Sequence, residues 1–421
     1  MSVAETFIEE DGFGFIPRPA RNKHNQPFEI VRRYTMTNKH KASVQLISWG
    51  ATIQAIKVPN QSGILGDVVL GFDDVEGYLK NRYIGSTIGR VAHKISMGKM
   101  KINNKNYSLT INDKTSMSHY NGGFFAFDNV NWNSYIFKKH VVMTHTSLRN
   151  SEGYPGDLLT QIKYSWTDDN QLIINIRACA TEPTPVNITN NCLMNLAGHA
   201  SGPKELRKHV ISLNAASWTF TDIISELPTG AILPVDHTVF DLRLPTQLTK
   251  RKLYIIPGGG YNQNLCITNF NRWFYRFHAR VIHPGSGRTL EVYSNHPGLR
   301  FSTGNDLPDL DRKYPPDFEE YCDCMDPVRP FLNSFLTKAR LSHESSKFRI
   351  ITQFQVKNVT EKEIWGKDGV RYQRHGGFIL SPQNYPDSIN IKNFPSCIIN
   401  PGQIYVHDIT YKFGLLTKNE Q

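Results

Sequence analysis

The sequence predicts an all-β fold, a large antiparallel β-sandwich. Short apolar runs separated by Gly, Pro, Asn and Ser residues make up most of the chain, and stretches with helical periodicity are few. Of the 421 residues, 39% are hydrophobic, which is enough for a large core. All-β folds often remain a single domain at such lengths, so length alone does not divide the chain.

The first 30 residues are interpreted as a polar lead-in. They carry Pro17, Pro19 and Pro27, and proline interrupts the hydrogen bonding of a strand. Residues 31–421 are taken as one sandwich domain.

Two strand–turn–strand patterns support this interpretation. They are Lys99–Ile102 with Tyr107–Ile111 around the turn Asn103–Asn106, and Phe277–Ile282 with Thr289–Tyr293 around the turn Pro284–Gly287. Polar and glycine-containing turns of this length join antiparallel strands. Many strands at such spacing are typical of a sandwich of two sheets.

Residues 309–365 interrupt the strand rhythm and are expected to be an insertion. Their first part is acidic and rich in proline, and Phe331–Leu341 could form a short helix. Cys322 and Cys324 lie among acidic residues, but no second pair completes a tetrahedral metal site. We therefore expect an acidic loop there and no metal.

The formal net charge of +11 raises the question of a nucleic-acid or membrane partner. Basic residues are nevertheless scattered. In the densest segment, Arg272–Arg280, basic and apolar residues alternate, which predicts one strand with a solvated cationic face. An anion-binding strip is the alternative for this face, and no nucleic-acid partner is expected.

The beginning of the chain shows no signal peptide, and no run approaches 18 apolar residues. We expect no membrane partner and a cytoplasmic protein.

A series of collinear motifs carries a family resemblance. It comprises Ser48–Thr52, Asp67–Phe72, Ile88–Ala92, Gly122–Gly123, Glu152–Asp157, Thr184–Gly198, Phe240–Arg243, Ser286–Arg288, Gln383–Asp387 and Asn400–Gly402. In this order they resemble the galactose mutarotase (aldose 1-epimerase) family. The resemblance implies an antiparallel β-supersandwich of galactose mutarotase-like type, with a sugar cleft on one curved sheet and no cofactor.

Mutarotation requires one group to remove the proton of the anomeric hydroxyl and another to protonate the ring oxygen. By the resemblance, the family uses a glutamate base and a histidine acid, whose pKa values can be tuned for this work. This sequence has Ser381 at the base position and Asn191 at the acid position. An amide does not titrate, and a serine hydroxyl is a poor base unless a neighbour activates it.

Substitutions also occupy the sugar-binding positions that the resemblance indicates. They are His93 and Lys94 after Gly89–Ala92, Asn121 before the paired glycines, Asn262, and His296 before Pro297. Lys94 keeps a positive charge without the planar fork of an arginine. These groups could still hold a sugar, and the positive charge makes an anionic sugar a candidate ligand.

Three functions follow as hypotheses. The first is a catalytically degenerate mutarotase homologue with a carbohydrate-binding or regulatory role. The second is an active aldose 1-epimerase of hexose metabolism that rebuilds the acid–base pair from His119, His296 or Asp387. The third is a protein-interaction scaffold that binds its partner through residues 309–365. The sequence leaves the oligomeric state open.

Overall fold

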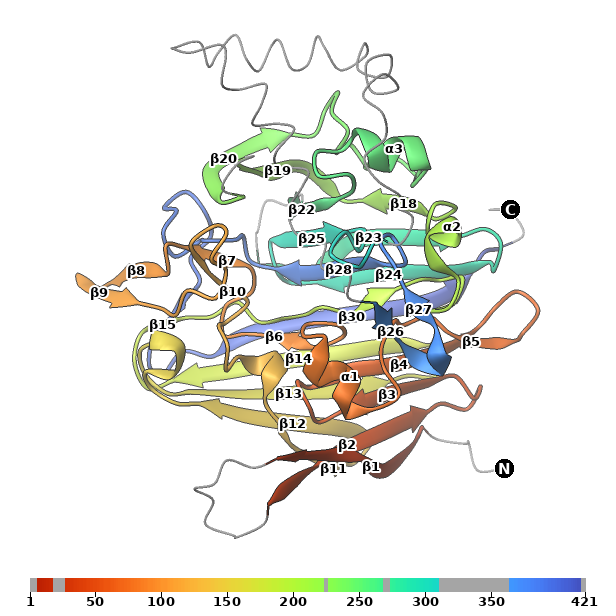
Figure 1. Ribbon diagram of the computed structural model, residues 1–421, viewed down its shortest axis with the longest axis horizontal. Coiled ribbons are helices and arrows are strands. Elements are labelled where there is room, and N and C mark those ends of the chain that lie inside the picture. The colour runs from red at the N-terminus through yellow and green to blue at the C-terminus, as the bar shows by residue number, and fades with distance from the viewer. Residues whose placement is uncertain (1–5, 18–26, 223–225, 268–272, 310–362, 418–421) are drawn as a thin grey trace.

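The computed structural model describes residues 6–17, 27–222, 226–267, 273–309 and 363–417. Three antiparallel sheets contain most of the strand residues, and the helices of the described ranges are few and short (Figure 1). The all-β antiparallel fold expected from the sequence is confirmed.

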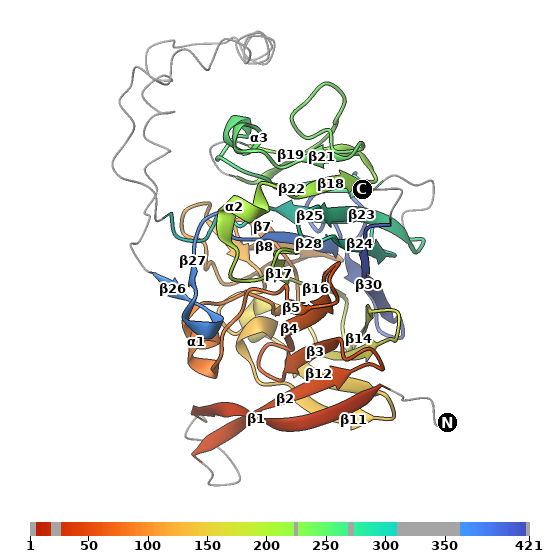
Figure 2. The same cartoon turned by 90° about the vertical axis from the view of Figure 1, so that its right-hand side faces the viewer.

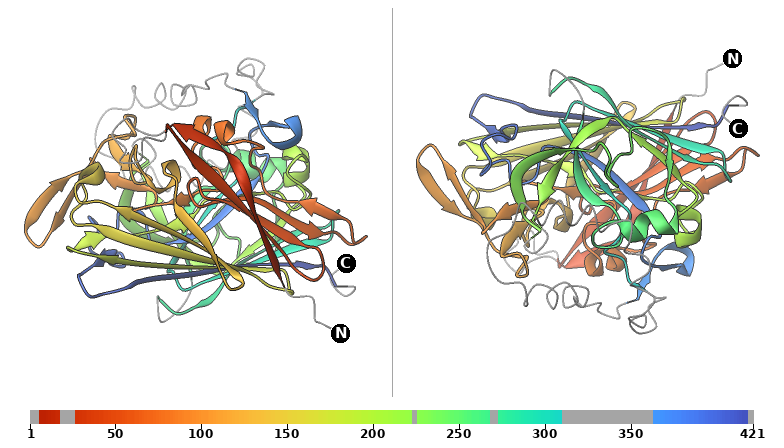
Figure 3. Two further views of the ribbon diagram at one scale, coloured as in Figure 1. Left: turned by 90° about the horizontal axis from the view of Figure 1, so that it is seen from below. Right: turned by 90° about the horizontal axis from the view of Figure 1, so that it is seen from above.

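The largest sheet has nine strands, and Figure 3 shows its long strands as one broad layer. In spatial order they are β11 (Asn133–Phe137), β12 (His140–Ser147), β13 (Leu158–Trp166), β14 (Gln171–Ala180), β30 (Tyr405–Leu415), β24 (Arg288–Ser294), β23 (Arg276–His283), β18 (Val210–Leu213) and β21 (Thr246–Gln247). The last strand of the chain, β30, therefore pairs in the middle of the sheet, between β14 and β24.

A six-stranded sheet packs against this layer. Its order is β17 (Leu193–Met194), β28 (Phe378–Gln383), β25 (Gly298–Ser302), β22 (Asn262–Ile267), β19 (Ala215–Thr221) and β20 (Pro228–Pro234). The five-stranded sheet runs β1 (Phe7–Pro17), β2 (Phe28–Thr37), β3 (Ser43–Ile47), β4 (Thr52–Pro59) and β5 (Leu65–Asp67). Figures 1 and 2 place the β1–β2 hairpin at one end of the molecule and β19 at the other.

Short elements complete the fold. The strand pairs are β7 (Lys94–Ser96) with β10 (Ser118–Tyr120), β8 (Lys99–Ile102) with β9 (Lys105–Ser108), β6 (Thr87–Ile88) with β16 (Thr189–Asn190), β15 (Thr184–Pro185) with β29 (Ile398–Ile399), and β26 (Ile364–Trp365) with β27 (Arg371–Tyr372). The helices are α1 (Val75–Lys80), α2 (Gly202–Leu206) and α3 (Lys250–Ile255), with 3₁₀ turns at Phe127–Asn129, Ser151–Gly153 and Lys367–Gly369.

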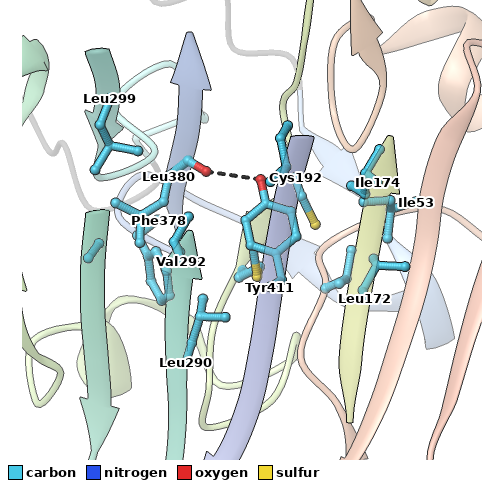
Figure 4. Close-up of a cluster of buried hydrophobic side chains, with 14 of the residues drawn as sticks. Ile53, Leu172, Ile174, Cys192, Leu290, Val292, Leu299, Phe378, Leu380 and Tyr411 are labelled. Carbon is cyan, nitrogen blue, oxygen red and sulfur yellow. Dashed lines mark hydrogen bonds between the residues drawn. The ribbon is translucent and has the colours of Figure 1, made fainter. Parts of the chain in front are cut away.

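The core lies between the nine-stranded and six-stranded sheets. Buried side chains from β24, such as Leu290 and Val292, share one apolar cluster with Leu299 of β25 and Phe378 of β28 (Figure 4). One polar contact crosses this core, because the hydroxyl of Tyr411 donates a hydrogen bond to the carbonyl oxygen of Leu380 at 3.0 Å. Strand β30 is thereby attached to β28 as well as to its neighbours in the large sheet.

The first 30 residues differ from the expected lead-in. Residues 7–17 form β1, which pairs with β2 along its whole length. The reason is burial, since Phe13 and Ile16 pack in a cluster with Val31 and Trp49. The prolines do not prevent this, because Pro17 stands at the end of an edge strand.

The two predicted hairpins are present with shifted ends. Strand β9 begins at Lys105, so that the first turn consists of Asn103 and Asn104, both with positive φ. In the second hairpin, the prediction that the basic residues of Arg272–Arg280 share one solvated face of a regular strand is wrong. A register shift between Phe277 and Ala279 marks a bulge in β23, and His278 is buried rather than solvated.

The expected insertion lies almost wholly outside the described residues, and so do Cys322, Cys324 and Phe331–Leu341. Just after it, the buried Lys367 donates to the carbonyl oxygen of Gln54 at 2.9 Å and pairs with Asp67. This contact attaches the returning chain to the five-stranded sheet.

None of the helices in the described ranges is long and apolar enough to span a bilayer.

Removing the Tyr411 hydroxyl tests the link between the sheets. Tyr411→Phe leaves the buried carbonyl of Leu380 without this donor, so we expect the free energy of unfolding to fall by about 1 kcal/mol. Urea denaturation measures the change. The matched control is Tyr135→Phe on the exposed β11, expected within about 0.5 kcal/mol of the parent. Equal stability of the two variants would contradict the role of the hydroxyl.

Buried neutral histidines generate a second prediction. Burial lowers the pKa of His209 and of His278 to about 3, and that of His407 to about 4. In the unfolded chain these groups take up protons near pH 6.5. The contribution of these neutral histidines to the free energy of unfolding is therefore fully present above that pH. It is lost as the pH falls toward their pKa values in the folded state.

We expect the free energy of unfolding to fall below about pH 6.5 by roughly 1.4 kcal/mol per pH unit for each such histidine. Urea denaturation between pH 5 and pH 8 measures this slope. His407→Gln removes one buried titrating group and should make the slope shallower, whereas His237→Gln at an exposed turn should not. A slope unaffected by His407→Gln would count against this account.

Candidate functional site

The candidate site is a small cavity where the six-stranded sheet meets the β6–β16 pair and the loops around β7 and β10. Its lining residues are Ile88, Ala92, His93, Asn121, Thr189, Asn191, Arg300, Ser381 and Gln383. The cavity volume is about 10 Å³, which is room for about one water molecule. Four of the seven residues that the sequence indicated are therefore brought together, namely His93, Asn121, Asn191 and Ser381.

Asn191 lies between β16 and β17 and is held at both ends of its side chain. Its Nδ2 donates to the carbonyl oxygen of Tyr83 at 3.0 Å, and its Oδ1 accepts from Nη1 of Arg300 at 3.1 Å. The residue is buried, with 8% of its surface exposed. The amide at the family's acid position thus connects the Tyr83 loop to Arg300.

Arg300 of β25 spans the cavity and was not indicated by the sequence. Its Nε and Nη2 donate to Oδ1 of Asn262 at 3.1 Å and 2.9 Å, in addition to the bond to Asn191. The guanidinium is buried, yet within the described part of the chain its hydrogen-bond acceptors are amide oxygens and no carboxylate pairs with it. Asn262 itself is exposed and lies outside the cavity lining.

Ser381 of β28 stands directly opposite Arg300 in the antiparallel pairing of β25 and β28. Its hydroxyl donates to the carbonyl oxygen of Asn190 at 2.7 Å. Among the described residues, no histidine or carboxylate is hydrogen-bonded to the Ser381 hydroxyl to activate it. At the position of the family's base, this chain therefore has a serine hydroxyl that is hydrogen-bonded to the backbone, and the cationic Arg300 stands opposite it.

His93 and Asn121 form the side of the cavity nearest β7 and β10. Oδ1 of Asn121 accepts from the backbone N–H of His93 at 2.8 Å, and the backbone N–H of Asn121 donates to the carbonyl of His93. Nδ1 of His93 is buried without a hydrogen-bond partner among the described residues. Burial, with Arg300 and Lys94 nearby, holds the pKa of His93 well below its ordinary value, so the ring is neutral at pH 7.

Lys94 follows His93 but does not line the cavity. Its ammonium lies 3.2 Å from Asp113 and 3.1 Å from Glu226. The positive charge of Lys94, which the sequence suggested as a contact for an anionic ligand, is therefore paired with two carboxylates of the chain itself.

The remaining histidines that were considered lie in other surroundings. The ring of His296 is fully buried and stacks on His407 with centroids 3.5 Å apart. His119 is held by the carbonyl oxygen of Thr110 at 2.7 Å and the hydroxyl of Tyr154 at 2.8 Å. Neither residue lines the cavity.

Asp387 has a framework role, because its carboxylate accepts hydrogen bonds from Ser96 and from Asn390. It is buried and lies outside the cavity lining.

The lining residues offer hydrogen bonds, one neutral imidazole and one guanidinium, and no carboxylate. Among the residues that the structure describes, no group of three or more His, Cys, Asp and Glu side chains is arranged to hold a metal ion. The arrangement can bind an acceptor-rich ligand at Arg300. Among the described lining residues, no carboxylate stands beside the neutral imidazole of His93.

One sequence signal for Arg300 existed. It lies in the run Gly298–Ser302, three residues after Pro297 in a segment of otherwise apolar and small residues. An arginine inside such a run is expected only where its charge interacts with a specific partner.

Comparisons with known proteins agree with this architecture. The family model described as aldose 1-epimerase matches residues 32–412. Human galactose mutarotase is 36% identical over 373 residues, which cover 88% of this chain and 91% of the relative. An aldose epimerase homologue from C. elegans has the same fold, with a TM-score of 0.70, 23% identity and coverage of 90% of this chain and 97% of that one.

Galactose 1-epimerase from Lactobacillus acidophilus also shares the fold, with a TM-score of 0.68, 17% identity and coverage of 98% of this chain and all of that one. The antiparallel supersandwich is thus of galactose mutarotase-like type. Because the family model spans nearly the whole described chain and the human relative aligns over most of both lengths, the chain belongs to the aldose 1-epimerase family.

Proposed function

We propose that this chain is a non-catalytic member of the aldose 1-epimerase family that binds a ligand in its cleft without converting it. The observation that carries the proposal is the position of Arg300. It bridges Asn191 and Asn262 and stands opposite Ser381 on the neighbouring strand. A guanidinium thus lies between the positions where, by the family resemblance, the acid and the base would act.

Two further observations support the proposal. Both polar ends of the Asn191 amide are already bonded, and the Ser381 hydroxyl is bonded to a backbone carbonyl. The cavity has room for about one water molecule, so a hexose ring requires Arg300 to move. The human relative is called a galactose mutarotase, and that activity is what the proposal denies to this chain.

Polarimetry tests the absence of activity. Freshly dissolved α-galactose in a dilute, weakly catalytic buffer should approach its anomeric equilibrium at the same rate with and without this protein. Human galactose mutarotase is the positive control, and a folded thermal transition shows that the sample is intact. A rate that increases in proportion to added protein would refute the proposal.

A rescue experiment tests the role of Arg300 in the loss of activity. Asn191→His with Ser381→Glu restores an imidazole and a carboxylate, but the new carboxylate faces Arg300 across the strand pair. An ion pair there lowers the pKa of the carboxylate and weakens it as a base. We expect little activity from the double variant.

Adding Arg300→Gln to the double variant should raise the rate of mutarotation by about 10²-fold or more, because a positioned base contributes about that factor. The same polarimetric assay measures it. If the double variant is already as active as the triple variant, Arg300 is not the obstacle that we propose.

One observation favours the alternative of an active aldose 1-epimerase. His93 is the single imidazole among the lining residues, and its Nδ1 is unpaired within the described structure. If polarimetry does reveal activity, His93→Asn is the variant that should abolish it.

A further inference from the structure

We infer that the cleft takes a sugar bearing an anionic group, a carboxylate or a phosphate, and that Arg300 is the residue that recognises it. This inference rests on the proposed function, because it treats the cleft as a binding site.

The hydrogen bonds of Arg300 are incomplete and weak for a cation. A guanidinium has five N–H donors, and the described chain accepts from Arg300 in three bonds, all to neutral amide oxygens. Two donors are therefore left for a ligand. Carboxylate and phosphate oxygens bind a guanidinium more strongly than amide oxygens do, and their spacing matches its planar fork.

Of the two asparagines that hold Arg300, the exposed Asn262 can release it at low cost. The bonds to Asn262 are made at an exposed residue, where water replaces a lost partner. Asn191 keeps its own bond to the carbonyl oxygen of Tyr83 when Arg300 leaves. An arriving anion thus exchanges with amide oxygens, and Arg300, which is only 7% exposed as a residue, has already lost most of its contact with solvent.

Among the described residues, no carboxylate lines the cavity or forms an ion pair with Arg300. The nine lining residues include no Asp or Glu. Asp113 and Glu226 are directed at Lys94, which keeps them paired with a different cation. A neutral hexose offers Arg300 only uncharged oxygens in exchange for the amide oxygens that it displaces, whereas an anionic sugar adds a full negative charge, so the site favours the anionic sugar.

Isothermal titration calorimetry with the full chain tests this preference. The ligands are galactose, galacturonate and galactose 1-phosphate, with inorganic phosphate to ask whether the anion alone is sufficient. We expect at least one of the two sugar anions to bind about 10- to 100-fold more tightly than galactose, the range that one additional bond to a charged group supplies. Comparing the affinities of galacturonate and galactose 1-phosphate shows whether the site prefers a carboxylate or a phosphate.

Variants assign the preference to Arg300. Arg300→Gln should abolish the advantage of the anions, and Arg300→Lys should retain only part of it because the fork is lost. The matched control is Arg177→Gln, which removes an arginine that already pairs with Asp408 on the large sheet. Asn262→Ala removes the exposed competitor for Arg300 and should preserve or strengthen anion binding.

Three outcomes would overturn the inference. They are galactose binding as tightly as the anions, an anion preference that survives Arg300→Gln, and loss of anion binding in Asn262→Ala. None of these depends on polarimetry. Detected mutarotation refutes the proposed function, whereas an inactive protein without an Arg300-dependent preference refutes only the inference.

Discussion

The position of the cleft depends on β30, the strand that completes the large sheet. Its buried side chains reach the two segments that carry the cleft. The Tyr405 hydroxyl accepts from the backbone N–H of Ile188 at 3.0 Å, and Nδ1 of His407 bonds the carbonyl of the same residue at 2.7 Å. The Tyr411 hydroxyl bonds the carbonyl of Leu380. Since Ile188 and Leu380 adjoin the cleft positions, their backbone is fixed whatever side chains stand at 191 and 381.

This separation of framework from chemistry allows the side chains of the site to differ without a change of fold. The bonds from β30 are made to backbone carbonyls and an N–H, and these groups are the same for every residue type. In this chain the residues of the site are linked to one another. A carboxylate at 381 would face Arg300, whereas the serine that is present leaves the guanidinium to the amide oxygens of Asn191 and Asn262.

The sequence predicted the fold well because its signals are local or framework-based. Alternation and turn residues located the hairpins, and collinear motifs located the strands that carry Asn191 and Ser381. The failures have a common cause, which is pairing between residues distant in the sequence. Lys94 is matched by Glu226, which lies 132 positions away. His278 was assigned to the wrong face because a bulge in β23, which no turn residue announces, breaks the alternation.

Arg300 was missed for a related reason. The family resemblance points only to the positions of the acid, the base and the sugar contacts, and Arg300 is at none of them. The cross-strand register shows that Arg300 and Ser381 lie side by side, which only the sheet reveals. A titrating acid–base pair held in a closed cleft costs stability, as functional groups in active sites commonly do. Asn191, Asn262 and Arg300 are instead hydrogen-bonded to one another, and these bonds persist until a ligand offers Arg300 a stronger acceptor.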